Sequence, residues 1–321
     1  MKRIFALFAL IFTLPLLAFA DNLPSWNEGE LKGKIIEFIM QVSDKNSSKF
    51  VQPEDRIAVF DNDGTLWSEQ PIYFQAFYAV DYVQKHFSEN PGWAENPALV
   101  ALNEKGLAAA TEFTEHDLLT LVAVSHANMD SDKFNASVNE WITTATHPTT
   151  GTLYTQMVFQ PMLELIDYLY ANDFKVFIVS GGGIDFLRVW APTVYNIPSE
   201  RIIGSRLKNE YQVIEGEPVI IKLPELEFND DKEGKPVAIH NNIGKKPILA
   251  VGNSDGDFQM LEWTTSEANN LGILLHHTDD EREFAYDRKS IAGKLDKGLE
   301  VNQPNWLIID MKNDWNTVYP E

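Results

Sequence analysis

Three short apolar segments, each followed by a polar turn that contains glycine, constrain the fold of this chain more than any other feature. With their turns they span 56–65 (RIAVFDNDGT), 175–183 (KVFIVSGGG) and 248–257 (ILAVGNSDGD). Their apolar parts, 56–60, 175–180 and 248–252, have the length and composition of strands buried on both faces. Because helical stretches separate them, they predict an α/β fold with a Rossmann-like parallel sheet flanked by helices. Ligands of such sheets bind just beyond the carboxyl ends of the strands.

The remaining pattern predicts where the other elements lie and how the chain is divided. Helices are expected at 31–42, 72–87, 98–110, 115–127, 132–146, 161–172 and 236–244, further strands at 271–276 and 307–310, and a hairpin at 211–223. Five of these helices fall between the first and second buried strands, and the first four of them lie within 71–148. We therefore expect a core domain formed by 21–70 and 149–321, with a helical cap domain at 71–148.

The first twenty residues have the pattern of a secretory signal peptide. Lys2 and Arg3 precede an apolar run of about 16 residues, and Ala18 and Ala20 form a small-x-small cleavage site. The run is shorter than the roughly 20 residues that a membrane-spanning helix needs. We expect cleavage after Ala20, export to the periplasm or the medium, and no stable membrane anchor afterwards.

Composition excludes several functions. The chain has no cysteine, which rules out disulfides, thiolate zinc sites and cysteine nucleophiles. Its formal net charge of −21 argues against nucleic acid or an anionic membrane surface as the main partner. A small phosphorylated ligand remains compatible with that charge because a local pocket can oppose the overall field. The sequence does not specify an oligomeric state.

Asp61 and Asp63 are the first candidates for chemistry. Two carboxylates one residue apart after a buried strand repel each other, and a divalent cation such as Mg²⁺ removes the conflict. One carboxylate can then attack phosphorus while the other moves protons. The alternative is a surface turn capped by Asx side chains. A calcium-binding EF-hand does not fit, because Gly64 falls at position 4 of the loop and not at position 6.

Four motifs in order resemble those of the haloacid dehalogenase-like hydrolase superfamily. Segments 60–66 (FDNDGTL), 178–182 (IVSGG) and 252–257 (GNSDGD) resemble its first, second and fourth signatures, and Lys235 stands before a helix and a strand, as the family lysine does. The resemblance covers about 55–280 and is nearest to the phosphoserine-phosphatase-like and acid-phosphatase-like members. It implies the α/β core and the inserted helical cap stated above.

The resemblance also implies residue roles. Asp61 would be the nucleophile that forms an aspartyl-phosphate, and Asp63 would protonate the leaving alcohol and then activate water. The phosphate group would be bound by Gly64, Thr65, Ser180, Gly181 and Lys235. Because the dehalogenases of the superfamily lack the second acid, Asp63 favours a phosphatase or a phosphotransferase.

The metal ligands follow the family less closely. Mg²⁺ would be held by Asp61, the Asp63 main-chain carbonyl and the fourth-motif turn, where Asn253 stands in place of the usual aspartate. Asn253, Asp255 and Asp257 all remain candidates for the direct ligand, with Asn253 and Asp257 preferred.

Two further side chains near these motifs have open roles. Glu69 either reads a cationic group on the substrate or is a supporting carboxylate behind the site. Asp185 and Arg188, one helical turn apart, are expected to form a surface ion pair.

We expect a secreted, Mg²⁺-dependent phosphatase that hydrolyses a small phosphorylated metabolite through an aspartyl-phosphate. A phosphotransferase with the same chemistry is the first alternative. A non-enzymatic periplasmic binding protein on the same scaffold is the second. The identity of the phosphomonoester depends on cap side chains whose positions the sequence does not specify.

Overall fold

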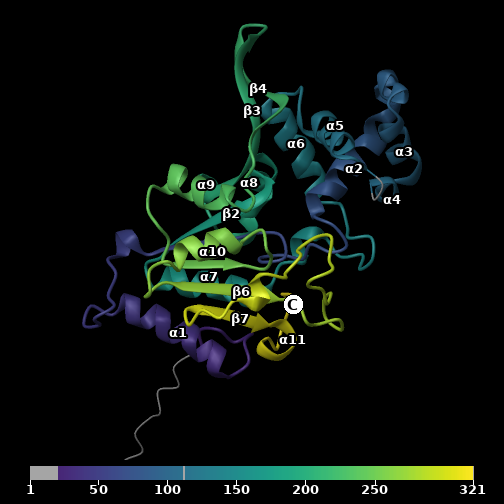
Figure 1. The fold of residues 1–321 in the computed structure, drawn as a ribbon. Coiled ribbons are helices and arrows are strands. Elements are labelled where there is room, and N and C mark those ends of the chain that lie inside the picture. Colours follow the sequence, from purple (N-terminus) through teal and green to yellow (C-terminus); the bar gives the residue numbers. More distant parts are fainter. Residues whose placement is uncertain (1–20, 111–112, 321) are drawn as a thin grey trace, which may run out of the picture.

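A computed structural model describes residues 21–110 and 113–320 (Figure 1). The described residues form a seven-stranded sheet in the order β4-β3-β2-β1-β5-β6-β7. The strands are β1 (Ile57–Phe60), β2 (Lys175–Gly183), β3 (Ile202–Ile214), β4 (Glu217–Phe228), β5 (Leu249–Gly252), β6 (Leu271–His276) and β7 (Trp306–Asp310). In this spatial order, all neighbouring strands are parallel except β4 and β3, which pair antiparallel. The predicted α/β fold is confirmed, while the predicted signal peptide, 1–20, lies outside the described residues.

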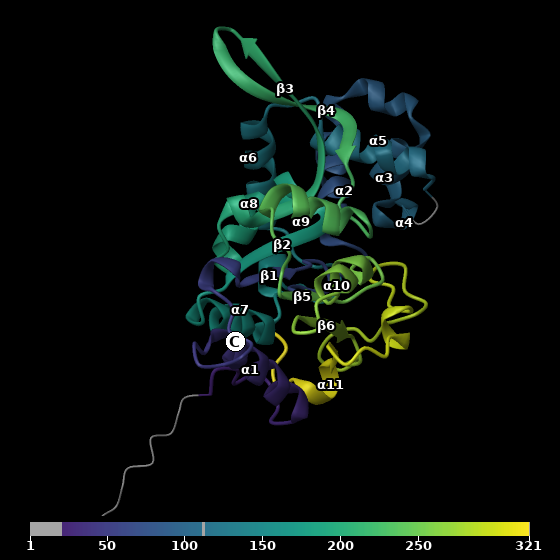
Figure 2. The ribbon, with the colours of Figure 1, turned by 60° about the vertical axis from the view of Figure 1, so that its left-hand side comes forward.

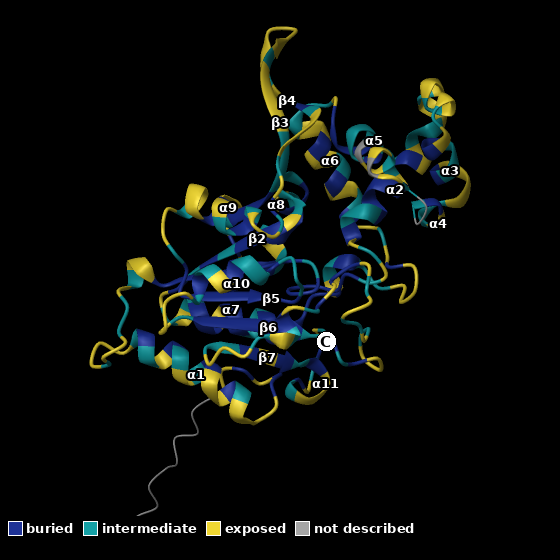
Figure 3. Cartoon of the chain, viewed as in Figure 1, coloured by how far each residue is buried: buried dark blue, intermediate teal, exposed yellow. Residues whose placement is uncertain are grey.

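Helices cover both faces of the sheet, which explains why its central strands are apolar throughout. Ala58 and Phe60 of β1 pack in one cluster with α1 (Glu30–Ser43), α7 (Gln160–Ala171) and α8 (Ile184–Tyr195). Ile57 and Val59 point to the other face and pack with α9 (Gly234–Ile243) and α10 (Phe258–Thr264). Figure 3 shows these strands as a buried layer. β1, between β2 and β5, therefore delivers the residues that follow it to the middle of the sheet edge.

A helical insertion follows β1 and stands apart from the sheet (Figure 1). It comprises α2 (Phe74–His86), α3 (Pro97–Lys105), α4 (Leu107–Ala110), α5 (Glu115–His126) and α6 (Ser131–Ile142). The insertion has a buried apolar cluster of its own, which includes Val83 and Leu102. The single helix predicted at 98–110 is divided because Gly106 ends α3 with a positive φ of 57°. The domain boundaries at 70/71 and 148/149 remain a prediction.

The β3–β4 hairpin is longer than the sequence pattern indicated. The predicted hairpin, 211–223, is the outer part of a ladder that extends back to the sheet edge. Its turn, Glu215-Gly216, has φ values of 54° and 90°, the backbone that a two-residue hairpin loop requires. Figures 1 and 2 both show the tip projecting beyond the sheet, while β4 also contacts α5 and α6. The hairpin thus forms one wall between the core and the helical insertion.

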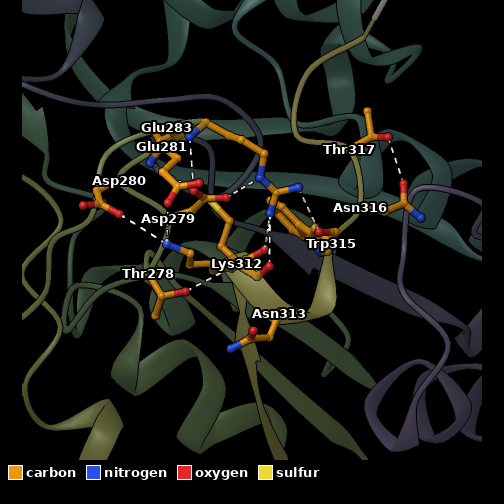
Figure 4. A network of polar contacts seen from close by, with 12 residues as sticks. Thr278, Asp279, Asp280, Glu281, Glu283, Lys312, Asn313, Trp315, Asn316 and Thr317 are labelled. Carbon is orange, nitrogen blue, oxygen red and sulfur yellow. Dashed lines mark hydrogen bonds and ion pairs between the residues drawn. The ribbon is translucent and has the colours of Figure 1, made fainter.

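The chain after β6 is fastened to the C-terminal segment (Figure 4). The Arg282 guanidinium donates to the carbonyl oxygens of Trp315 at 2.9 Å and Met311 at 3.2 Å, next to Asp279. Met311 begins the short helix α11 (Met311–Asp314). These bonds fix the segment that carries His277 and Tyr286 toward the loop that follows β1. Across the described ranges, no helix combines the length and apolarity needed to cross a bilayer.

Candidate active site

The predicted site residues gather at the carboxyl ends of β1, β2 and β5. Asp61 follows β1 directly, and its main-chain N–H donates to the Val251 carbonyl of β5 at 2.9 Å. A cavity of about 520 Å³ opens at this edge of the sheet. Its floor includes Asp61, Asp63, Gly181 and Lys235. The strand order therefore brings together side chains that are more than 170 residues apart in the sequence.

Lys235 joins two carboxylates beneath the cavity. Its Nζ donates to Asp61 Oδ1 at 2.5 Å, to Asp257 Oδ1 at 2.6 Å and to the Val179 carbonyl at 2.9 Å. Burial alone would lower the pKa of Lys235, but the charges of Asp257 and Asp61 raise it above its ordinary value. Lys235 is therefore a permanent cation. The other lysines of this region pair elsewhere: Lys222 with Asp185, Lys232 with Asp231, Lys245 with Asp55 and Lys246 with Glu267.

The environment of Asp61 opposes its ionisation. Burial raises the pKa of Asp61 well above the ordinary value, the charge of Asp257 adds to the rise, and Lys235 counteracts both. Lys235 holds Oδ1, while Oδ2 accepts the longer 3.3 Å contact from the Thr65 hydroxyl. Asp61 is 6% exposed, so one oxygen can reach a bound ligand while the rest of the side chain stays fixed.

Asp63 lies on the other side of the turn. Trp67 Nε1 donates to Asp63 Oδ1 at 2.8 Å, and Trp67 is itself stacked on Trp190 at 4.1 Å between ring centroids. Burial raises the pKa of Asp63, an effect that the Trp67 bond partly offsets. A carboxyl group that holds its proton nearer to neutral pH is suited to donate that proton to a leaving group.

Gly64 allows the loop after β1 to turn tightly. It has a φ of +72°, and a Cβ at this position would lie 2.1 Å from Asn253 Nδ2 and 2.2 Å from Glu69 Oε1. Its carbonyl accepts a 2.7 Å hydrogen bond from His277 Nε2. Thr65 is fully buried, and its hydroxyl lies 3.2 Å from Asn253 Oδ1. The loop is thus held from both β5 and the segment after β6.

Ser180 and its glycines form the neighbouring wall. The Ser180 hydroxyl is buried and accepts from the Gly182 N–H at 3.0 Å. A Cβ on Gly182 would lie 3.4 Å from Asp63 Oδ2, so this backbone passes close to the second acid. Gly181 is exposed to the cavity, and its carbonyl accepts from the Ser205 hydroxyl at 2.8 Å. This wall presents backbone groups without side chains, as a phosphate-binding turn does.

The three candidates of the fourth motif have different surroundings. Asp257 Oδ2 accepts from the main-chain N–H groups of Asn253 and Ser254, each at 3.0 Å, while its Oδ1 binds Lys235. Asp255 accepts from the main-chain N–H groups of Asp296 and Gly298 and so anchors the C-terminal segment. Of the three, the Asn253 side chain is the one in contact with both Thr65 and Glu69.

Glu69 is buried and has no cationic partner in the hydrogen bonds and ion pairs of the described residues. Its Oε1 accepts from Asn253 Nδ2 at 2.6 Å and from the Tyr286 hydroxyl at 2.7 Å. Burial raises the pKa of Glu69 well above the ordinary value, and these two bonds only partly offset the rise. The sequence did not indicate Tyr286, because it reaches the site through a loop 29 residues after the fourth motif.

The donor set is compatible with a magnesium ion. Asp61, Asp63, Glu69 and Asp257 all line the cavity and each offers hard oxygen atoms, while Lys235 pairs with two of them, Asp61 and Asp257. Within the described ranges, three or more histidine or acidic side chains do not converge as a ready ligand group. A cation here would therefore use a mixture of carboxylate, amide and main-chain oxygens.

The prediction that Asp185 and Arg188 form an ion pair is wrong. Asp185 forms its ion pair with Lys222 of β4. The Arg188 guanidinium donates instead to the carbonyl oxygens of Ser199 and Ile202. Asp185 and Lys222 both line the cavity, so this corrected pairing becomes part of the site.

Comparison with known proteins agrees with this geometry. The family model described as "haloacid dehalogenase-like hydrolase" matches residues 58–262. The chain belongs to this hydrolase family. Its predicted membership is therefore confirmed, and the matched region contains the four motifs and the helical insertion. A search of curated proteins finds no match.

Solved structures of low sequence identity are similar to this hydrolase. A conserved protein of unknown function from Anaerococcus prevotii is 16% identical, with a TM-score of 0.51 over 77% of this chain and 86% of its own. A phosphoserine phosphohydrolase-like protein from Francisella tularensis is 18% identical, with a TM-score of 0.37 over 68% and 87%. A substrate-bound phosphoserine phosphatase complex is 14% identical, with a TM-score of 0.35 over 69% and 86%. The first of these supports the fold assignment.

Proposed function

We propose that this hydrolase is a secreted, Mg²⁺-dependent phosphatase that cleaves small phosphomonoesters through an aspartyl-phosphate on Asp61. One observation carries the proposal. The Asp61 carboxylate is held by a buried, permanently charged Lys235 at the floor of a cavity, with a second acid, Asp63, two residues further on. A pure hydrolase of carbon–halogen bonds has no need of that second acid.

The first step transfers the phosphoryl group to the protein. An Asp61 oxygen attacks phosphorus, the bond between phosphorus and the ester oxygen breaks, and the Asp63 carboxyl gives its proton to the departing alkoxide. Lys235, the Ser180 hydroxyl and the Gly181 main-chain N–H stabilise the negative charge that develops on the phosphoryl oxygens.

The second step releases phosphate. Asp63, now ionised, takes a proton from water while the water oxygen attacks phosphorus, and the bond between phosphorus and Asp61 breaks. Asp61 is thereby restored as a carboxylate beside Lys235. Positioning and charge neutralisation supply most of the rate in such transfers.

Residues for the metal are available beside this nucleophile. Asp61, the Asp63 main-chain carbonyl and the Asn253 amide oxygen would hold Mg²⁺, with Asp257 supporting the turn. When bound, the ion neutralises charge on phosphate and carboxylate oxygens.

Export and the class of substrate complete the proposal. The leader pattern in residues 1–20 supports secretion to the periplasm or the medium. The cavity has the size of a small-molecule site, which supports a phosphorylated metabolite as substrate.

The test is phosphate release from p-nitrophenyl phosphate with Mg²⁺ and with EDTA. We expect metal-dependent turnover, which Asp61→Asn should abolish. Asp55 is a half-exposed acid paired with Lys245, so the control variant Asp55→Asn should retain turnover. Turnover by Asp61→Asn at the wild-type rate would refute the assignment of the nucleophile. Adding alcohols as acceptors and finding phosphorylated products would favour a phosphotransferase.

A further inference from the structure

The cavity continues from the catalytic floor into an apolar chamber beneath the helical insertion. Side chains of α2, α5, α6 and α8 line it, among them Ala79, Leu121, Val122, Phe134 and Phe186. Leu207, Pro224 and Leu226 of the β3–β4 hairpin close the opposite side. A leaving group attached to a phosphate on Asp61 would have to occupy this space.

The cationic groups of the chamber are already neutralised. Among the described residues that line it, Lys222 pairs with Asp185, Lys235 with Asp61 and Asp257, and Arg206 with Glu227. Lys222 is 2% exposed, and its Nζ lies 5.0 Å from the centre of the Phe134 ring. A second phosphate or a carboxylate on the substrate would therefore meet no free positive charge.

The polar groups on the wall are also satisfied by one another. The Gly183 N–H donates to Gln75 Oε1 at 2.8 Å, and Gln75 Nε2 lies 2.8 Å from His126 Nε2. His126 Nδ1 lies 2.7 Å from the Ser125 hydroxyl, which donates to the Leu121 carbonyl. Burial, reinforced by the charge of Lys222, lowers the pKa of His126 to about 3, so the imidazole is neutral. A polar leaving group would gain few new hydrogen bonds here.

From the chamber's lining and its paired charges, we infer that the substrate is a monophosphate ester of an uncharged, largely apolar alcohol. This inference rests on the proposed phosphatase function. Acids predominate around the chamber, with Asp185 and Asp231 beyond the catalytic group, so a leaving group with its own negative charge is disfavoured. Apolar burial is the interaction that the chamber does offer.

A series of linear alkyl monophosphates from ethyl to hexyl tests the inference, because their leaving groups have nearly the same intrinsic reactivity. We expect kcat/KM to rise about three- to fourfold for each methylene until the chamber is full. The bisphosphate of 1,6-hexanediol is the charged match to hexyl phosphate, and we expect at least a hundredfold lower kcat/KM for it.

A charge introduced at the chamber sharpens the test. Leu118 lines the chamber and is 47% exposed, so Leu118→Lys adds a cation without opening the core. We expect this variant to improve the bisphosphate relative to hexyl phosphate at least tenfold. The control is Ile291→Lys, which changes the net charge equally at a side chain that is 91% exposed, and which should leave the ratio unchanged.

Binding of the matching alkylphosphonates to the wild-type protein, measured by calorimetry, separates the two proposals. Affinity that rises with chain length without any turnover of the esters would support the chamber and overturn the phosphatase function. Turnover or affinity that is independent of chain length, or a preference for the bisphosphate, would overturn the inference while leaving the phosphatase function intact.

Discussion

Removing the charge of Lys235 is the perturbation that most directly tests the proposed arrangement of the site. Lys235→Met keeps most of the length of a side chain that is 2% exposed, but deletes the cation that lies 2.5 Å from Asp61 and 2.6 Å from Asp257. Two buried carboxylates then lose the same partner. Breaking one buried ion pair costs about 3–5 kcal/mol, and we expect the upper end, about 5 kcal/mol, in the free energy of unfolding near neutral pH.

The loss should depend on pH with a defined sign. Burial and the charge of Asp257 raise the pKa of Asp61 even with Lys235 present, and without it that pKa rises further. A carboxyl whose pKa is higher in the folded state takes up a proton on folding, so the variant loses stability as pH rises through that pKa. The raised pKa of Lys235 keeps its contribution complete below the ordinary lysine value. The difference between wild type and variant should therefore be larger at pH 8 than at pH 5.

Urea unfolding followed by tryptophan fluorescence, without added metal, measures this difference at both pH values. The matched control is Lys245→Met, a half-exposed lysine paired with Asp55, for which we expect a loss under about 1 kcal/mol. Adding Asp257→Asn to Lys235→Met should recover part of the stability, because one of the two unpaired charges is gone. A loss below about 1 kcal/mol, or an equal loss at pH 5 and pH 8, would refute the reasoning.

Three further changes test other parts of the site. Gly64→Ala should destabilise the fold by about 1–3 kcal/mol and abolish activity, because φ is +72° and the new Cβ would overlap Asn253; urea unfolding and phosphate release measure the two effects. Asp63→Asn should reduce kcat for an alkyl phosphate by about 100-fold or more, and should remove the decline in kcat as pH rises through the raised pKa of Asp63, which a pH–rate profile detects. Glu69→Gln should weaken Mn²⁺ binding, measured by electron paramagnetic resonance, since it replaces a buried carboxyl that a bound cation would hold ionised by a neutral amide; unchanged Mn²⁺ binding with a higher KM would instead favour a role in substrate recognition.

Local sequence patterns predicted the core of the fold because burial of a strand is visible in the composition of the strand itself. A strand covered on both faces, such as β1 or β5, must be apolar throughout, and the sequence reports that directly. Helix ends were harder, since the split at Gly106 depends on one glycine with a positive φ. The hairpin was underestimated because β3 begins in the sheet and leaves it without a break in the strand.

The site was predictable where its residues follow strand ends, and less so elsewhere. Asp61 and Asp63, which follow β1, and Lys235, in the first turn of α9, could be found from motifs whose order the parallel sheet converts into proximity. The partner of Asp185 could not, because a spacing of three residues to Arg188 gave no sign that Lys222 would arrive from β4. Tertiary contacts of this kind depend on the path of the hairpin and on the helical insertion.

The acidity of the chain and the apolar lining of the chamber favour the same kind of substrate. A formal net charge of −21 repels anions that approach the protein. At physiological ionic strength, salt screens this repulsion at distances greater than about 8 Å. A phosphate monoester of an apolar alcohol carries little charge for its size, so it meets the least repulsion on entry. Burial of its apolar part adds affinity that salt hardly affects. Raising the salt concentration should therefore increase kcat/KM for a bisphosphate more than for hexyl phosphate. An equal response of the two esters would show that the charge of the surface does not contribute to the selectivity between them.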